Sequence, residues 1–289
     1  MYGMSLRTIW RPIAVSIIVA ATVAAFAHYF DIHPEIWRQL QYTPVHILVA
    51  LCALYLLFIG SLALINSATL RLCNTRLDNR ESLLLTAYSS VINFFGPLQS
   101  GPAFRAAYLK RRHGTVLKKY GTATLLYYLF YACFSGLFLI SGLVGWWLIP
   151  LTILFVAGGW VLYLQKLKTN KRLTALTISN WYYLAAATLL QVSLQVAIYY
   201  VELRSIVPSV HLSQVIVYTG AANFALFVSI TPGAIGFRES FLLFSQHLHH
   251  ISNSAIVLAT TIDRAAYIIV LLLMAMLIFG THAQTRLKK

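Results

Sequence analysis

The sequence predicts an all-α integral membrane protein, on three observations. Hydrophobic residues make up 59% of the 289 residues and charged residues only 10%, against about a quarter in a soluble domain. Apolar runs long enough to cross about 30 Å of hydrocarbon recur along the chain. The 22 basic residues outnumber the 7 acidic ones and gather in short links beside the runs, where they set membrane orientation.

The apolar runs and their flanking charges predict six full spans. They cover residues 13–30, 46–66, 120–143, 146–165, 180–201 and 254–279. Arginines precede the first span, and basic clusters follow the second, fourth and sixth, so both termini are expected in the cytoplasm. The first run is also compatible with a secretory signal, but its span length and the spans that follow favour a retained helix.

Proline and glycine interrupt two further segments. The first, 81–96, is about 24 Å long as a helix, ends before Pro97 and has basic clusters on both sides. We therefore expect a re-entrant hairpin that enters and leaves on the cytoplasmic side. The second runs through 213–231, breaks, and returns through 237–248 as an opposed re-entrant hairpin. Because 213–231 is about 28 Å long as a helix, eight spans remain the alternative topology.

The two broken segments share a pattern. Each has Asn-Phe five residues after a tyrosine, then Pro-x-x-x-Gly, then arginine. The matched residues are Asn93, Pro97, Gly101 and Arg105 in the first segment, and Asn223, Pro232, Gly236 and Arg238 in the second. Because their flanking spans run in opposite directions, we expect an inverted repeat with halves 46–143 and 180–280 in a single membrane domain, 1–289.

These breaks are candidate substrate sites. A broken membrane helix is tolerated only where protein or a wet cavity surrounds it, and the helix that follows offers free N–H groups and a partial positive charge to an anion. The predicted substrate-binding residues are the eight matched ones together with Gly233 and Glu239. The alternative is that proline and glycine merely let helices pack closely, with Arg238 held by an acid.

Four charges are expected to meet near the second break. Asp263 and Arg264 lie inside the last apolar run, at a depth similar to that of Arg238 and Glu239. We expect Arg238 to pair with Asp263 and Glu239 with Arg264, because pairing lowers the cost of burying each charge. The two pairs would act as a clamp or as an outer gate.

Two glutamines add polar groups to the fifth span. Gln191 and Gln195 are four residues apart and share a helix face, with Asn223 a candidate to face them. They either line the substrate cavity or bond one helix to another.

Other functional classes lack support in the sequence. It has no Walker loop, H-E-x-x-H, G-x-S-x-G or dinucleotide fingerprint, so we expect no enzyme activity and no cofactor. The "HLHH" at 247–250 lacks the further ligands of a metal site. No basic face with interleaved aromatic residues lies outside the apolar runs, so we expect no nucleic-acid partner.

Three stretches resemble a known family: "NFFGPLQSGPAFRAAYL", "TPGAIGFRES" and "TTIDRAAYIIV", in this order. The family is the transmembrane region of lysylphosphatidylglycerol synthases, also described as the flippase-like domain family, and the resemblance covers nearly the whole chain. Its most specific element is Pro-Gly-x-x-Gly-x-x-Glu, here Pro232, Gly233, Gly236 and Glu239. Two departures are Ala234, where the family commonly has glycine, and Gln99, where many members have a basic residue.

The resemblance implies a flippase-like transporter in a bacterial cytoplasmic (inner) membrane. It would move an anionic or glycan-linked phospholipid between leaflets, with such membrane lipids as partners and a homo-oligomer as an option. Some members carry a soluble aminoacyl-transfer domain; these 289 residues contain none, so lipid synthesis is not implied for them. Two alternatives are a small-solute or ion-coupled secondary transporter and a non-catalytic accessory subunit of a membrane lipid-modifying enzyme.

Overall fold

The computed structural model describes residues 41–95, 100–145, 173–228 and 237–287, together with positions 31, 34, 147 and 150. The described residues are almost entirely helical and include no strand. The chain divides into two units, Met1–Thr43 and Pro44–Lys289, and the helices below belong to the second. The predicted spans 13–30 and 146–165 lie outside the described residues.

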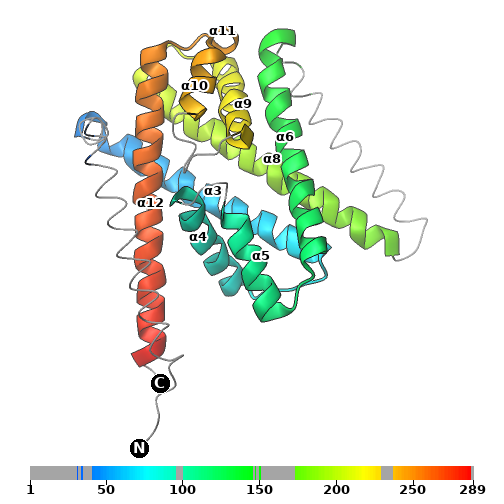
Figure 1. Ribbon diagram of the computed structural model, residues 1–289. Helices are drawn as coiled ribbons and strands as arrows, with labels where there is room; N and C mark the ends of the chain where they lie inside the picture. The colour runs from blue at the N-terminus through cyan, green and yellow to red at the C-terminus, as the bar shows by residue number, and fades with distance from the viewer. Residues whose placement is uncertain are drawn as a thin grey trace, which may run out of the picture. The chain divides into compact units, whose positions relative to one another are not determined.

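Four long helices match the other four predicted spans. They are α3 (Val45–Leu72), α6 (Leu117–Val144), α8 (Leu173–Ile206) and α12 (Asn253–Leu287) (Figure 1). Each contains a stretch long and apolar enough to cross a membrane. The 28 residues of α3 cover about 42 Å, which exceeds the hydrocarbon thickness, so its end reaches into the interface.

The long helices extend beyond the predicted spans, and the extension of α8 changes the environment of an acidic residue. The predicted span ends at residue 201, but α8 continues to Ile206 and buries Glu202 completely. The prediction was wrong because Glu202 and Leu203 are good helix formers, and Leu203 extends the buried face. The helix ends shortly before Pro208, which disfavours helical geometry in the preceding residue.

The first broken segment is an antiparallel helix pair, α4 (Asn79–Phe95) and α5 (Ser100–His113) (Figure 1). Near the break, the Ser100 hydroxyl donates to the Ile92 carbonyl over 3.0 Å, and the Gly101 N–H donates to Asn93 Oδ1 over 3.3 Å. At the other end, Tyr108 of α5 bonds to Glu81 of α4. These contacts at both ends show that the chain turns back on itself.

The second broken segment also folds back. Helix α9 (Leu212–Val228) packs against α10 (Phe237–Phe244) and α11 (Gln246–His249). The Phe224 and Phe241 rings stack with centroids 6.4 Å apart, and the Tyr218 and His249 rings lie 5.4 Å apart. The return helix expected over 237–248 is therefore two short helices, interrupted by a turn at Ser245.

Helix packing follows one pattern in both halves. Helix α3 packs on α4 and α6 as α8 packs on α9 and α12; α5 contacts α6 as α10 contacts α12. Across the halves, α6 contacts α9 and α12 contacts α4, while α3 and α8 share the most extensive contact. Exchanging α3, α4, α5 and α6 for α8, α9, α10 and α12 reproduces these contacts; among the described helices, the contacts of α11 lack a counterpart. This pattern is what an internal repeat gives.

The largest buried apolar cluster lies among α3, α8, α9, α10 and α12. Its fully buried members include Leu51, Leu203, Tyr218, Leu242 and Ile256. Small residues let the backbones approach closely: alanines 221, 222 and 225 on α9, and 255, 259 and 266 on α12, are all buried. The ion pairs between α10 and α12 described below lie among these helices.

Helices α6 and α9 meet backbone to backbone at Gly220. A Cβ atom there would lie 2.4 Å from the Leu139 nitrogen and 2.7 Å from the Ser135 carbonyl oxygen. No flexible side chain can move to relieve that clash, so glycine is required by the close approach.

We expect Gly220→Ala to separate α9 from α6 and to lower thermal stability in detergent. Two glycine-to-alanine controls are Gly60, where a Cβ meets nothing within 4 Å, and Gly136, whose nearest neighbour is 3.8 Å away. Both should keep or raise the melting temperature, since alanine favours a helix over glycine by about 1 kcal/mol. An equal effect in all three variants would contradict the close contact.

Candidate functional site

One buried and one partly buried ion pair join α10 to α12. Arg238 Nη1 donates to Asp263 Oδ2, and Arg264 Nη2 donates to Glu239 Oε1. Both pairings are the ones expected from the sequence. Neighbouring residues on a helix point about 100° apart, so each charge reaches a different partner. The result is a two-point clamp between the second hairpin and the last long helix.

Asp263 has a second partner on a third helix. The Tyr55 hydroxyl of α3 donates to Asp263 Oδ1, so this carboxylate, only 3% exposed, is bonded through both oxygens. The Tyr55 ring also lies 4.9 Å from that of Tyr267. Nothing in the local sequence around Tyr55 signals this role, because its partner is 208 residues away.

Arg238 lies against α8. Its Cζ atom is 5.0 Å from the centre of the Tyr199 ring, a distance typical of a cation–π contact. Arg238 is 8% exposed, yet its Nε and Nη2 atoms have no hydrogen-bond partner among the described residues. The guanidinium therefore retains donors after pairing with Asp263.

Glu202 is the main residue that the sequence interpretation missed. It is 0% exposed, and neither carboxyl oxygen has a hydrogen-bond partner in the described part of the chain. It lies close enough to Arg238 for electrostatic interaction, and the Tyr218 hydroxyl nearby is also unpartnered. The sequence did contain a signal for Glu202: it is an acidic residue at the end of an apolar run in an acid-poor membrane protein. Such a residue is a functional candidate.

The two matched asparagines have different environments. Asn93 accepts the Gly101 N–H, and a Cβ on Gly101 would lie 2.9 Å from the Asn93 Cβ. Asn223 is fully buried, and neither atom of its amide group has a partner among the described residues. Asn93 therefore fixes the turn of the first hairpin, whereas Asn223 holds unsatisfied polar atoms in the second.

The glutamines of α8 bond to tyrosines of α6. The Tyr127 hydroxyl donates to Gln191 Oε1 over 3.1 Å, and the Tyr131 hydroxyl pairs with Gln195 at 3.2–3.3 Å. Both glutamines are buried. This geometry favours helix-to-helix bonding over cavity lining.

Arg105 differs from its counterpart Arg238. It is half-buried on α5, its Nε atom has no hydrogen-bond partner, and no carboxylate pairs with it within the described residues. It is close enough to Tyr127 and Tyr128 of α6 for electrostatic interaction. The remaining predicted substrate-binding residues, Pro97, Pro232, Gly233 and Gly236, lie outside the described residues.

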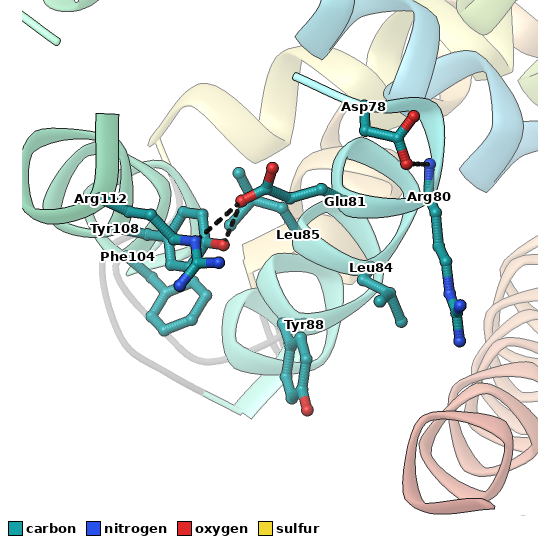
Figure 2. A pocket seen from close by; sticks show the side chains of 9 residues that line it. All are labelled: Asp78, Arg80, Glu81, Leu84, Leu85, Tyr88, Phe104, Tyr108 and Arg112. Atoms are coloured by element: carbon teal, nitrogen blue, oxygen red, sulfur yellow. Dashed lines mark hydrogen bonds and ion pairs between the residues drawn. The ribbon is translucent and has the colours of Figure 1, made fainter. Parts of the chain in front are cut away.

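A cavity of about 430 Å³ lies between α4 and α5, at the end away from the break (Figure 2). Leucine, tyrosine and phenylalanine side chains line part of it, and charged side chains line the rest. The lining residues are Asp78, Arg80, Glu81, Leu84, Leu85, Tyr88, Phe104, Tyr108 and Arg112. The cavity is therefore amphipathic.

Glu81 ties the two helices together beside this cavity. The Tyr108 hydroxyl donates to Glu81 Oε1 over 2.5 Å, His113 Nε2 lies 2.9 Å from the same oxygen, and Arg112 Nε lies 3.4 Å away. The Tyr108 hydrogen bond, followed by His113 and Arg112, lowers the pKa of Glu81. Burial and the neighbouring carboxylate raise the pKa of Tyr108 to about 12.

The histidines at 247–250 do not form a metal centre with other described residues. His249 Nε2 lies 3.0 Å from the Leu242 carbonyl, and its Nδ1 accepts the Ile251 N–H over 3.2 Å. Burial lowers the pKa of His249, consistent with a neutral ring. No group of three or more histidine, cysteine, aspartate or glutamate residues gathers in the described ranges.

The family model described as "Lysylphosphatidylglycerol synthase TM region" matches residues 13–275. The chain belongs to this family. Its match covers both hairpins and reaches into α12, and it confirms the resemblance seen in three short stretches. With four span-length apolar helices, the protein is an integral membrane protein of a family related to lipid modification or flipping. No curated protein matches the chain.

Asp263→Asn should be strongly destabilising, because it leaves Arg238 buried without its counter-ion. Breaking a buried pair in this way costs about 3–5 kcal/mol. The double change Asp263→Asn with Arg238→Gln removes both charges and should recover part of that loss. Thermal unfolding in detergent, analysed as a double-mutant cycle, measures the coupling; the same cycle on Glu239 and Arg264 provides the comparison. Zero coupling in both cycles would mean that no clamp exists.

Glu81→Gln should lower thermal stability at neutral pH. A carboxylate whose pKa is lowered by folding contributes stability above its unfolded value, about 4.3, and this contribution is lost as the pH falls through the lowered folded value. The stability gap between wild type and Glu81→Gln should therefore close only in that acid range. Asp78→Asn is the control, because that carboxylate is exposed. A gap that persists unchanged at the lowest pH would disprove the assignment.

Proposed function

We propose that this protein is a flippase-like transporter, without enzyme activity, that moves an anionic or glycan-linked lipid between membrane leaflets. The observation that carries the proposal is the contrast between the two matched arginines. Arg238 is held by Asp263, whereas no carboxylate in the described residues pairs with Arg105.

An arginine in this environment favours an anionic ligand. A partly buried cation without a counter-ion is costly, and a phosphate satisfies guanidinium through two parallel hydrogen bonds. Arg105 lies in the second turn of α5, near the positive end of the helix dipole, which also favours an anion. A lipid phosphate is therefore the ligand class that fits best.

The cavity between α4 and α5 supports a lipid over a small solute. Figure 2 shows the Phe104 ring beside Arg112, with the Tyr88 ring farther along the cavity wall from the charged group that Glu81 and Arg112 form. A headgroup with an attached chain presents the same combination of charged and apolar surface. A small-solute carrier would be expected to use a more uniformly polar pocket.

The exchangeable packing of the two halves supports the predicted topology. In our proposal both hairpins are re-entrant, the halves 46–143 and 180–280 form an inverted repeat, and both termini lie in the cytoplasm of a bacterium. Transport proteins of this kind bind substrate where paired broken helices meet. The 17 residues of α9 cover about 26 Å, which keeps a full crossing as the alternative.

The test is leaflet exchange of fluorescent phosphatidylglycerol in reconstituted vesicles, after native mass spectrometry identifies any lipid that co-purifies. Arg105→Gln should slow exchange about tenfold or more, because a hydrogen bond to a charged group contributes about 1.5–3 kcal/mol and about 1.4 kcal/mol is a factor of ten. Arg111→Gln, an exposed arginine on the same helix, is the matched control.

Both variants should keep the wild-type melting temperature, so that a slower rate is not a folding defect. If Arg105→Gln exchanged phosphatidylglycerol and the co-purified lipid at the wild-type rate, the anion site at Arg105 would be refuted.

A further inference from the structure

Glu202 combines complete burial with a lack of hydrogen bonds. Its side chain is 0% exposed, and neither oxygen has a partner among the described residues. An ionised carboxylate buried in this way loses its hydrogen bonds to water, and no hydrogen bond to the protein replaces them. The cost is several kcal/mol. The neutral, protonated carboxyl avoids most of that cost.

The charges around Glu202 lead to the same conclusion. Arg238 and Arg264 balance Asp263 and Glu239 in two ion pairs, so the buried cluster is neutral without Glu202. Ionised Glu202 would add an uncompensated negative charge. The ionisable groups close enough to interact electrostatically with Glu202 are Tyr199 on α8, Tyr218 on α9 and Arg238 on α10.

A metal ion is a poor alternative to a proton at this position. The nearest cationic group is the Arg238 guanidinium, which interacts electrostatically with Glu202 and would repel a second cation. Hard cations also need several oxygen ligands, whereas this cluster offers unpartnered nitrogen donors at Arg238 Nε and Nη2. Unpartnered donors on Arg238 are complementary to the unpartnered acceptors on Glu202.

We propose that Glu202 is a proton-binding residue that couples proton movement to lipid exchange; the coupling rests on the transport function proposed above. With the proton bound, Arg238 stays with Asp263 and α10 remains clamped to α12. When the carboxyl O–H bond breaks, the proton passes to water and the carboxylate accepts hydrogen bonds from the free nitrogens of Arg238. Arg238 is then shared between two carboxylates, which weakens the clamp.

The proton site can be tested without transport. Infrared spectroscopy of the purified wild-type protein at neutral pH should show the C=O band of a protonated carboxyl group, and Glu202→Gln should lack that band. The substitution resembles the protonated side chain in shape and charge, so the variant should fold. Carbon-13 labelling of glutamate in the wild type should shift the band, which separates Glu202 from Asp263 without any substitution.

Coupling is tested by leaflet exchange of phosphatidylglycerol in vesicles with and without a pH gradient. The wild-type rate should change by up to about tenfold per pH unit, the limit for one coupled proton. The rate of Glu202→Gln should be the same in both conditions. Glu35→Gln is the control and should keep the wild-type response, because this acid lies between the predicted spans 13–30 and 46–66.

The outcomes separate the two proposals. A band that persists in Glu202→Gln, or one that glutamate labelling does not shift, overturns the proton site whatever the transport result. Exchange by Glu202→Gln that still responds to the gradient overturns the coupling. If the wild type exchanges no lipid but shows the Glu202 band, the transport function fails and the proton site stands.

Discussion

The bond between Arg238 and Asp263 is the interaction on which the second half depends. It joins α10 to α12, and through the other carboxylate oxygen and Tyr55 it reaches α3. Each partner neutralises or bonds a charge that would otherwise be buried alone. If one of the three helices moved away, a buried charge would lose a partner, which is destabilising. The short helix α10, only 8 residues long, is held in place by this bond and by the second ion pair.

Much of this arrangement is predictable from the sequence because charges in an apolar run need partners. Arg238 and Asp263 are charged residues among apolar ones, and few residues of opposite charge lie at a similar depth to pair with them. Tyr55 was not predictable, since a tyrosine in a membrane helix is ordinary and its partner is 208 residues away. Glu202 was missed because it follows an apolar run directly, where an acid normally begins a loop.

The motif that predicts a repeat is visible in the sequence, but the different environments of its two copies are not. The motif places Arg105 and Arg238 at matching positions, yet their partners are decided by α6 and α12, which share no motif. Helix α12 supplies Asp263, whereas α6 contains no acidic residue and presents tyrosines near Arg105. Two copies of the same local motif therefore place arginine in different environments, because different helices pack on them.

The backbone contact at Gly220 makes the two equivalent contacts between the halves different in kind. Gly220 follows Thr219 on α9 as Ser90 follows Ser89 on α4, but only the glycine allows direct backbone contact, with α6. Ser90 instead bonds to Tyr267 on α12 through its side chain, a contact that can stretch or rotate. The contact between α6 and α9 therefore leaves little freedom to shift, whereas the contact between α4 and α12 can adjust without a clash of backbones.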